Sequence, residues 1–417
     1  MTASADPPQW VTRWLTAVRD RRWYRQPWHL VLLAAWAAKW FQVMAAGNPH
    51  SWRLFVLAAK LFVGQQPAAT FEPGGLHMYA NYPRFQFGPV TLGASALIRL
   101  IGPHEGVAAA QILMTIAGLA ILYLAERTAC LARPDLDPDQ IRWAAFGAGF
   151  VFVPVWAILA VSWGHLDDVL ALLLAAIAVN ALVRGRPVMT GVFLALSGSA
   201  KPWAFAFAVL LFALPAPRWR AIAWAAGVTL LLWAPFVIAD PHSIAAARYA
   251  IPNVEGSGLR ALGVNTPGTP SWDRAAQFAA GFGLSLIAIR RGRWPAVILI
   301  CTAVRVALDP NTYPYYDAGP VVGALVWDLI GARRAVPAWT FAAGSLFWVW
   351  SAAGNASMLS GDIRVGFAVA VVAYTVLAPA GSPVVQSIPA STPPQPAGPT
   401  PARGPAPSSP APSSPAT

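Results

Sequence analysis

The chain has 417 residues, of which 57% are hydrophobic and 11% are charged, and its net charge at pH 7 is +12. Soluble globular domains carry about 25% charged residues, so this composition excludes an ordinary water-soluble enzyme. The positive charge lies in short arginine clusters between apolar runs and not on one basic face. That pattern argues against nucleic acid as a partner and is typical of membrane proteins whose positive loops stay in the cytoplasm.

The basic residues 1–27 are expected to form a cytoplasmic N-terminus. Apolar runs then recur as far as residue 379, and they predict one all-α, polytopic membrane domain over residues 28–379. Residues 380–417, rich in Pro, Ser and Ala, are expected to form a disordered cytoplasmic tail.

Arginine clusters mark cytoplasmic ends, so an even number of crossings must separate one cluster from the next. The apolar runs that satisfy this condition are 28–46, 106–125, 143–162, 168–183, 188–200, 203–216, 220–238, 275–289, 294–308, 318–331, 337–353 and 363–379. They predict about twelve transmembrane helices with both termini cytoplasmic, in a bacterial plasma membrane.

Two apolar stretches in the first outer loop do not fit this count. Phe87 to Gly102 would reach only about 24 Å as a helix, which is less than the roughly 30 Å of a hydrocarbon core. In Ser51 to Gly64, apolar residues recur at helical spacing, with Arg53 and Lys60 able to reach the interface. We therefore predict two short interfacial helices in this loop.

With this orientation, the polar residues that carry chemistry fall in outer loops. The turn that begins at Trp163 brings His165, Asp167 and Asp168 to the start of a span. Such residues suit a general base, a metal ligand beside a phosphate, or binding of sugar hydroxyls. The alternative is a helix start capped by aspartate. Two adjacent carboxylates exceed what a cap needs, which favours a functional site.

Lys201 lies in the segment Ser-Gly-Ser-Ala-Lys-Pro (197–202), which breaks the sequence into two short apolar runs. Interrupted helices in membrane proteins often line a ligand site. No carboxylate lies near Lys201 in the sequence, so we predict that it binds a phosphate; the alternative is a lysine that extends to the interface from a proline kink. Arg305 lies within one helical turn of Asp309. Pairing of these two is the favoured interpretation, and contact with a phosphate is the alternative.

The segment from Asp309 to Asp317 combines carboxylates, an amide and three tyrosines. Aromatic faces with hydrogen-bonding groups suit sugar rings, whereas the alternative is an interfacial aromatic belt. We therefore expect Asn311, Tyr315, Tyr316 and Asp317 to bind substrate.

The first outer loop offers a second group of polar and aromatic residues, which predicts a substrate loop. Its members are Glu72, His77, Tyr79, Asn81, Tyr82, Arg84 and Gln86. A folded aromatic plug is the alternative. The sequence has no Walker loop, no dinucleotide glycine pattern and no His-Glu-x-x-His, so neither a nucleotide nor a zinc site is implied.

Three stretches are similar to the GT-C superfamily of membrane glycosyltransferases, and within it to the polyprenyl-phosphate-mannose-dependent mannosyltransferases (glycosyltransferase family 87). Ser51 to Gly64, with Tyr82-Pro83, resembles that family's first outer loop. Gly164 to Leu172 resembles its Gly-Gln-x-Asn segment, and Gly191 to Pro202 resembles its lysine-containing break.

This resemblance implies a divergent, inverting hexosyltransferase. It would move a sugar, expected to be mannose, from a polyprenyl-phosphate donor to an envelope glycolipid or glycan on the outer face. The family's base is an aspartate early in the first outer loop, but Ser51, preceded by His50, occupies that place here. The base would then be Asp168 or Asp167, with Glu72 or His50 in reserve.

In this interpretation Lys201, with Arg84 or Arg305, stabilises the departing phosphate, and His165, His77 and Tyr82 join the substrate-binding residues. The lipid-linked sugar is a co-substrate; no metal site is predicted, and the involvement of a divalent cation is left open. Membrane lipids are the remaining partners.

Two other functions remain open. The absence of the first-loop aspartate favours a non-catalytic protein that binds polyprenyl-phosphate lipids and scaffolds envelope assembly. A transporter ranks third, because only Lys39 and Arg305 resemble the ionisable residues at membrane depth that transport requires.

Overall fold

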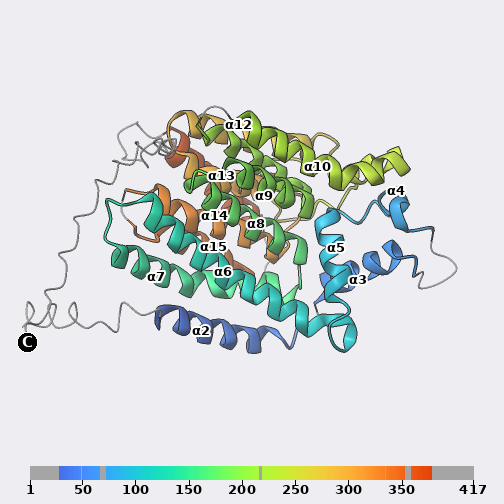
Figure 1. Cartoon of the computed structure of the whole chain (residues 1–417), viewed down its shortest axis with the longest axis horizontal. Helices are drawn as coiled ribbons and strands as arrows, with labels where there is room; N and C mark the ends of the chain where they lie inside the picture. The colour runs from blue at the N-terminus through green and yellow to red at the C-terminus, as the bar shows by residue number, and fades with distance from the viewer. Residues whose placement is uncertain are drawn as a thin grey trace, which may run out of the picture.

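The computed structural model describes residues 28–47, 49–65, 72–215, 218–333, 335–352 and 358–377. Within them the chain is helical throughout, apart from loops and one isolated β-bridge between Pro252 and Gly268 (Figure 1). The predicted all-α class is confirmed. The predicted basic N-terminus and disordered tail lie outside the described residues.

The helices follow one another along the chain with short connections. The first half contains α2 (Trp28–Met44), α3 (His50–Phe62), η2 (Gly75–His77), α4 (Met78–Asn81), α5 (Pro89–Ile98), η3 (His104–Gly106), α6 (Val107–Ala132), α7 (Pro138–Ala157), η4 (Ile158–Ser162), α8 (Leu166–Val183) and α9 (Pro187–Ala200). The second half contains η5 (Pro202–Ala213), α10 (Trp219–Ala239), η6 (Pro241–Arg248), α11 (Gly258–Ala261), α12 (Asp273–Arg290), η7 (Trp294–Ala296), α13 (Val297–Leu308), η8 (Pro314–Asp317), α14 (Ala318–Val326), η9 (Trp327–Gly331), α15 (Ala338–Ala352), α16 (Met358–Val372) and η10 (Ala373–Leu377).

Each of the twelve predicted spans overlaps a helix, but not all of these helices are long enough to cross a membrane. Five described helices are both long and apolar enough: His104–Ala132, Pro138–Ser162, Leu166–Val183, Trp219–Ala239 and Leu359–Leu377. Shorter apolar helices are Pro89–Ile98, Pro187–Ala200, Pro202–Ala213 and Trp294–Leu308. The apolar helices indicate a membrane protein, whereas the count of twelve spans is not confirmed.

The two short helices predicted in the first outer loop are present. In α3, Trp52, Phe55 and Ala59 are buried on one side while Arg53 is exposed, as expected for an amphipathic helix. The second, α5, is ten residues long and begins at Pro89, a residue that favours the first turn of a helix. Their placement at a membrane surface remains a prediction.

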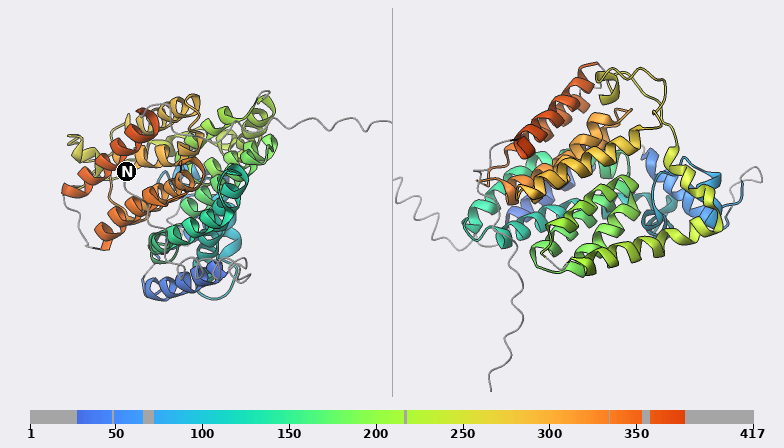
Figure 2. Two further views of the ribbon diagram at one scale, coloured as in Figure 1. Left: turned by 90° about the vertical axis from the view of Figure 1, so that its left-hand side faces the viewer. Right: turned by 90° about the horizontal axis from the view of Figure 1, so that it is seen from above.

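The loops predicted to lie outside meet at one end of the bundle. There the Ser51 amide donates to the Trp163 carbonyl (3.1 Å) and the Gly88 amide donates to the Ala200 carbonyl (2.8 Å). The helices α3, α4 and α5 lie together at the right of Figure 1. The view from above in Figure 2 places the same blue segments at the same end.

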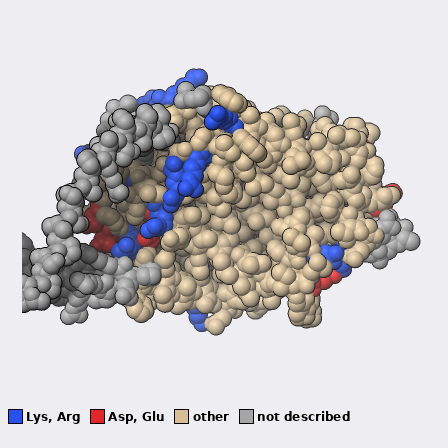
Figure 3. Space-filling view, viewed as in Figure 1, with Lys and Arg blue, Asp and Glu red and all other residues tan. Residues whose placement is uncertain are grey.

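Arginines gather towards the opposite end. Arg133, which follows α6, donates to the backbone oxygens of Ala332 (2.5 Å) and Arg333 (3.1 Å), so two predicted cytoplasmic clusters are adjacent in space. On the face shown in Figure 3, lysine and arginine collect towards the left, and uncharged residues cover most of the remainder. The predicted separation of the loops into two groups at opposite ends of the bundle is therefore seen in the fold. Which of the two ends faces the cytoplasm remains a prediction.

Candidate functional site

The turn before α8 depends on a glycine. Gly164 adopts a left-handed φ of 60°, which lets the chain reverse after η4. A Cβ on Gly164 would lie 2.9 Å from the Cβ of Pro49, so the close approach of the first outer loop also favours glycine. This turn brings His165, Asp167 and Asp168 to the beginning of α8, where all three are buried.

The break between α9 and η5 places Lys201 beside this turn. Lys201 is in extended conformation (φ −139°, ψ 116°) and separates the two helices. Its Nζ forms an ion pair with Oδ2 of Asp167. No carboxylate lies near Lys201 in the sequence, but packing of α9 on α8 supplies a partner that lies 34 residues away. Binding of a phosphate by Lys201 remains a prediction.

Asp168 is held by a second cation and by an indole. Trp203 Nε1 donates to Asp168 Oδ1 at 2.8 Å, and Arg305 Nη1 lies 3.4 Å from the same oxygen. The Arg305 guanidinium lies 4.4 Å from the ring centroid of Trp203 and 4.3 Å from that of Tyr316. Two aromatic rings and a carboxylate thus fix its position.

The predicted pairing of Arg305 with Asp309 is wrong; its partner is Asp168. Spacing of four residues brings side chains together only within a helix. The helix α13 ends at Leu308, and Asp309 is in extended conformation, so its carboxylate leaves the helical register.

His165 connects the two aspartates. Its Nδ1 lies 3.0 Å from Asp168 Oδ2 and also contacts Asp167 Oδ1. The imidazole stacks on the ring of Tyr315, with centroids 3.8 Å apart and planes inclined by 26°. This contact fixes the ring orientation and directs Nδ1 towards the carboxylates.

Aromatic residues extend the site towards solvent. Trp163 and Tyr313 are both half-buried, and each packs against Tyr315, with centroids 5.2 Å and 5.3 Å away respectively. The exposed ring of His50 lies 6.4 Å from Trp163. Sugar rings pack well against such faces. Tyr315 and Tyr316, which the sequence predicted to bind substrate, are themselves buried, and contact of a sugar with them remains a prediction.

The net charge of the buried cluster depends on His165. Burial lowers the pKa of His165, but the carboxylates of Asp167 and Asp168 raise it by more, so that its pKa lies above the ordinary value of 6.5. With His165 protonated, three cations (His165, Lys201, Arg305) face two carboxylates, and the net charge is +1. One negative charge, such as that of a phosphodiester, would neutralise the cluster.

A metal ion is the other ligand to consider. His165, Asp167 and Asp168 place one ligand atom each within 4.8 Å of one another. Both carboxylates already pair with cationic side chains, Lys201 and Arg305, and a divalent ion would add two positive charges next to them. The donor geometry permits a metal, whereas the charge balance favours an anion.

Two of the predicted substrate-binding residues form a neighbouring group instead. Arg364 of α16 donates to the backbone oxygen of Asn311 at 2.8 Å, and its Nη2 lies 3.4 Å from Asp317 Oδ1. These contacts hold the loop that carries Tyr315 and Tyr316. A role in positioning the aromatic residues fits Asn311 and Asp317 better than direct contact with a substrate.

The candidates in the first outer loop are anchored elsewhere. His77 Nδ1 lies 3.5 Å from Asp240 Oδ2, and the Tyr82 hydroxyl donates to the backbone oxygen of Glu72 at 2.6 Å. The Arg84 guanidinium lies over the neighbouring Phe85 ring. Glu72 and Arg84 are exposed, in contrast to the buried carboxylates of α8.

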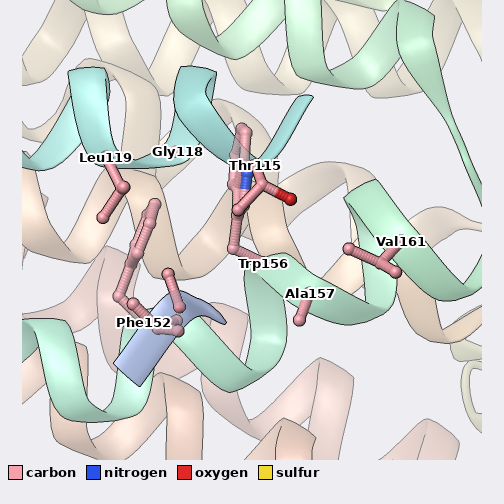
Figure 4. A pocket seen from close by; sticks show the side chains of 9 residues that line it. Thr115, Gly118, Leu119, Phe152, Trp156, Ala157 and Val161 are labelled. Atoms are coloured by element: carbon pink, nitrogen blue, oxygen red, sulfur yellow. The ribbon is translucent and has the colours of Figure 1, made fainter. Parts of the chain in front are cut away.

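An apolar pocket lies between α2, α6 and α7 (Figure 4). Its lining consists of Ala37, Thr115, Gly118, Leu119, Phe152, Val153, Trp156, Ala157 and Val161. The indole nitrogen of Trp156 already donates to the Met114 oxygen at 2.8 Å. None of these nine residues has an ionisable side chain. The buried cluster of His165, Asp167, Asp168, Lys201 and Arg305 is therefore the candidate catalytic or binding site.

Trp163 and Tyr313 lie in segments that the sequence singled out, but neither they nor Trp203 was among the predicted site residues. A tryptophan next to Lys-Pro or Gly-His was the available signal, but aromatic residues are also common at membrane interfaces, so the signal was weak.

Neither a protein-family model nor a curated protein matches the chain.

Proposed function

We propose that the protein is an integral membrane glycosyltransferase that moves a sugar, expected to be mannose, from a polyprenyl-phosphate donor to an envelope glycolipid or glycan acceptor. The observation that supports this function best is the buried cluster of Asp167, Asp168, His165, Lys201 and Arg305, bordered by aromatic rings. It combines a proton acceptor, a cation for a leaving phosphate and faces for a sugar ring.

The roles follow from the surroundings of each residue. Asp167 takes the proton of the acceptor hydroxyl, whose oxygen forms a bond to the anomeric carbon from the side opposite to the phosphate. The bond between that carbon and the phosphate oxygen breaks, and polyprenyl phosphate leaves with Lys201 as its counter-ion. Asp168 is a positioning residue, because Trp203 and Arg305 both hold it.

The topology proposed for this function has twelve crossings and both termini in the cytoplasm of a bacterial cell. It places the cluster on the outer face of the plasma membrane, where lipid-linked sugars are donors that need no nucleotide. Support comes from the meeting of the predicted outer loops at one end of the bundle and of Arg133 with the 332–333 loop at the other.

The test is transfer by the purified full-length protein in lipid nanodiscs, with polyprenyl-phosphate mannose as donor and release of polyprenyl phosphate as readout. Asp167→Asn and Lys201→Met should each reduce the rate by about 10²–10⁴-fold, as expected for loss of a general base or of charge stabilisation. Asp240→Asn is the matched control, because this carboxylate pairs with His77 outside the cluster. Equal rates in all four proteins would refute the site.

A second function is favoured by the fact that both buried carboxylates already have cationic partners. Such a cluster could bind a polyprenyl phosphate without catalysing transfer, in a protein that scaffolds envelope assembly. Tight binding of the lipid without turnover by any acceptor would support this alternative. Flux of a lipid-linked sugar across proteoliposomes would instead indicate the transporter.

A further inference from the structure

The buried cluster presents Asp167 in a state that cannot act as a base. Its Oδ2 is paired with Lys201, and its Oδ1 contacts His165. A carboxylate with two cationic neighbours holds a proton weakly. A ligand must therefore change this arrangement before Asp167 can accept a proton from an alcohol.

The two cations of the cluster differ in how firmly they are held. Arg305 is fixed between Trp203 and Tyr316, and its side chain is 7% exposed. The Lys201 side chain is 14% exposed, against 1% for its partner Asp167. An ammonium on a flexible four-carbon chain also re-aims more easily than a stacked guanidinium. An anion that enters from solvent thus meets Lys201 before it meets Asp167.

We propose that a phosphate anion takes Lys201 away from Asp167, and that this exchange of ion-pair partners is the event that frees the Asp167 carboxylate. The proton step rests on the proposed function, whereas the exchange concerns binding alone. After the exchange, Lys201 neutralises the phosphate and Asp167 keeps only His165 as a charged partner. Binding of the donor and activation of the base are then one event. While no phosphate is bound, Asp167 stays paired with Lys201 and does not act as a base.

The exchange makes Asp167 an internal competitor of the ligand. Asp167→Asn removes this competitor and leaves Lys201 without its counter-ion, so phosphate affinity should rise by about tenfold while transfer is lost. Asp240→Asn is the matched control, because it removes one carboxylate charge that pairs with His77 outside the cluster. Its affinity should change by less than about twofold. Lys201→Met should lose the phosphate-dependent part of binding.

The experiment measures dissociation constants of the full-length protein in nanodiscs of zwitterionic lipid. The probes are farnesyl phosphate, inorganic phosphate and farnesol. Asp167→Asn should bind farnesyl phosphate more tightly than wild type, the double variant with Lys201→Met should lose this gain, and farnesol should bind all variants alike. A parallel gain for inorganic phosphate would identify a free anion as a sufficient ligand. A gain confined to farnesyl phosphate would identify a lipid headgroup. Unchanged or weaker binding of both phosphates by Asp167→Asn overturns the exchange.

A second readout does not depend on folding of Asp167→Asn. In wild-type protein, farnesyl phosphate should shift a carboxylate stretching band in the infrared difference spectrum, because Asp167 loses its ammonium partner. Lys201→Met should abolish the shift, and binding without a shift refutes the exchange. A protein that shows the exchange but transfers no sugar would refute only the proposed function. Transfer by a protein that lacks the exchange would refute only this inference.

Discussion

Adjacent carboxylates in one buried site can differ in role when their neighbours differ. Asp167 is paired with the partly exposed Lys201, whereas Asp168 accepts from Trp203 and pairs with a fixed Arg305. In the proposed exchange, a ligand takes the more exposed cation, Lys201, so Asp167 is the carboxylate that is released. For this reason Asp167 is the proposed base and Asp168 a positioning residue.

Trp203→Phe isolates the hydrogen bond to Asp168. It removes the indole N–H that donates to Asp168 Oδ1 but keeps an aromatic ring beside Arg305. A hydrogen bond to a charged group contributes about 1.5–3 kcal/mol, so we expect the free energy of unfolding to fall by about 2 kcal/mol. Unfolding by a denaturing detergent would measure this change. Trp219→Phe on α10, where the residue is 62% exposed, is the control; equal losses in both variants would contradict the assigned hydrogen bond.

The raised pKa of His165 predicts that the stability of the folded protein depends on pH. Its pKa lies above 6.5 in the folded protein because Asp167 and Asp168 outweigh the effect of burial. A raised pKa means that the stabilisation is fully present below about pH 6.5 and is lost as pH rises through the folded value. The groups that face the imidazole are Asp167, Asp168, Tyr315 and Phe55.

The measurement is the thermal unfolding midpoint of wild type and of His165→Gln at intervals from about pH 6 to 9. Wild type should become less stable as pH rises from about 6.5 through the folded pKa of His165, and the variant should show a flatter curve. Subtracting the two curves removes the contribution of other histidines. Identical slopes would show that His165 does not titrate in this interval.

At the scale of elements, α10 has one main packing partner. It packs mainly on α9, and among its described residues only Ala221 and Phe236 are buried. At the contact, a Cβ on Gly191 of α9 would lie 2.2 Å from the Ala221 carbonyl oxygen. A glycine here lets the two backbones approach closely, as small residues do between membrane helices.

Gly191→Ala should therefore force α10 away from α9 and lower the free energy of unfolding by about 1–3 kcal/mol, the usual effect of overpacking. Gly227→Ala within α10 is the matched control, because a Cβ there would have no atom within 4 Å. Replacing a glycine in an open helix position should be neutral or stabilising. Equal destabilisation of both variants in a detergent unfolding experiment would contradict the proposed contact.

Local patterns predicted the elements better than their contacts. The break at Lys201 could be predicted because Pro202 and the small residues before it oppose a continuous helix. The ion pair with Asp167 could not, because it depends on how α9 packs on α8. Arg305 shows the same limit: spacing suggested a partner on its own helix, but that helix ends before Asp309.

For the whole molecule, the arginine distribution predicted which loops lie together but not how many helices span a membrane. The helix α9 has 14 residues and reaches about 21 Å, which is less than a hydrocarbon core of about 30 Å. An apolar run in a sequence shows where a helix lies but not where a break shortens it. The number of crossings therefore needs a direct measurement of sidedness.

Single cysteines would test the two-sided arrangement in a background with Cys130 and Cys301 replaced by alanine. His242→Cys lies at the end that holds the buried cluster, where His242 is 88% exposed at its side chain. Gln140→Cys lies at the arginine end, near the start of α7, and Gln140 is also exposed. Because the cluster is expected on the outer face, a membrane-impermeant maleimide should label His242→Cys in intact cells. It should label Gln140→Cys only after permeabilisation.

Labelling of both sites in intact cells would mean that the two ends lie on one side of the membrane, and the even-crossing rule applied to the arginine clusters would fail. A reversed result would keep the fold but turn the cluster towards the cytoplasm. Donors on that side include soluble nucleotide sugars. The main physical reason for proposing a polyprenyl-phosphate donor would then be lost. If labelling is as expected, Lys201 and Asp167 lie on the outer side of the membrane. In that compartment, sugars are activated as lipid-linked phosphates.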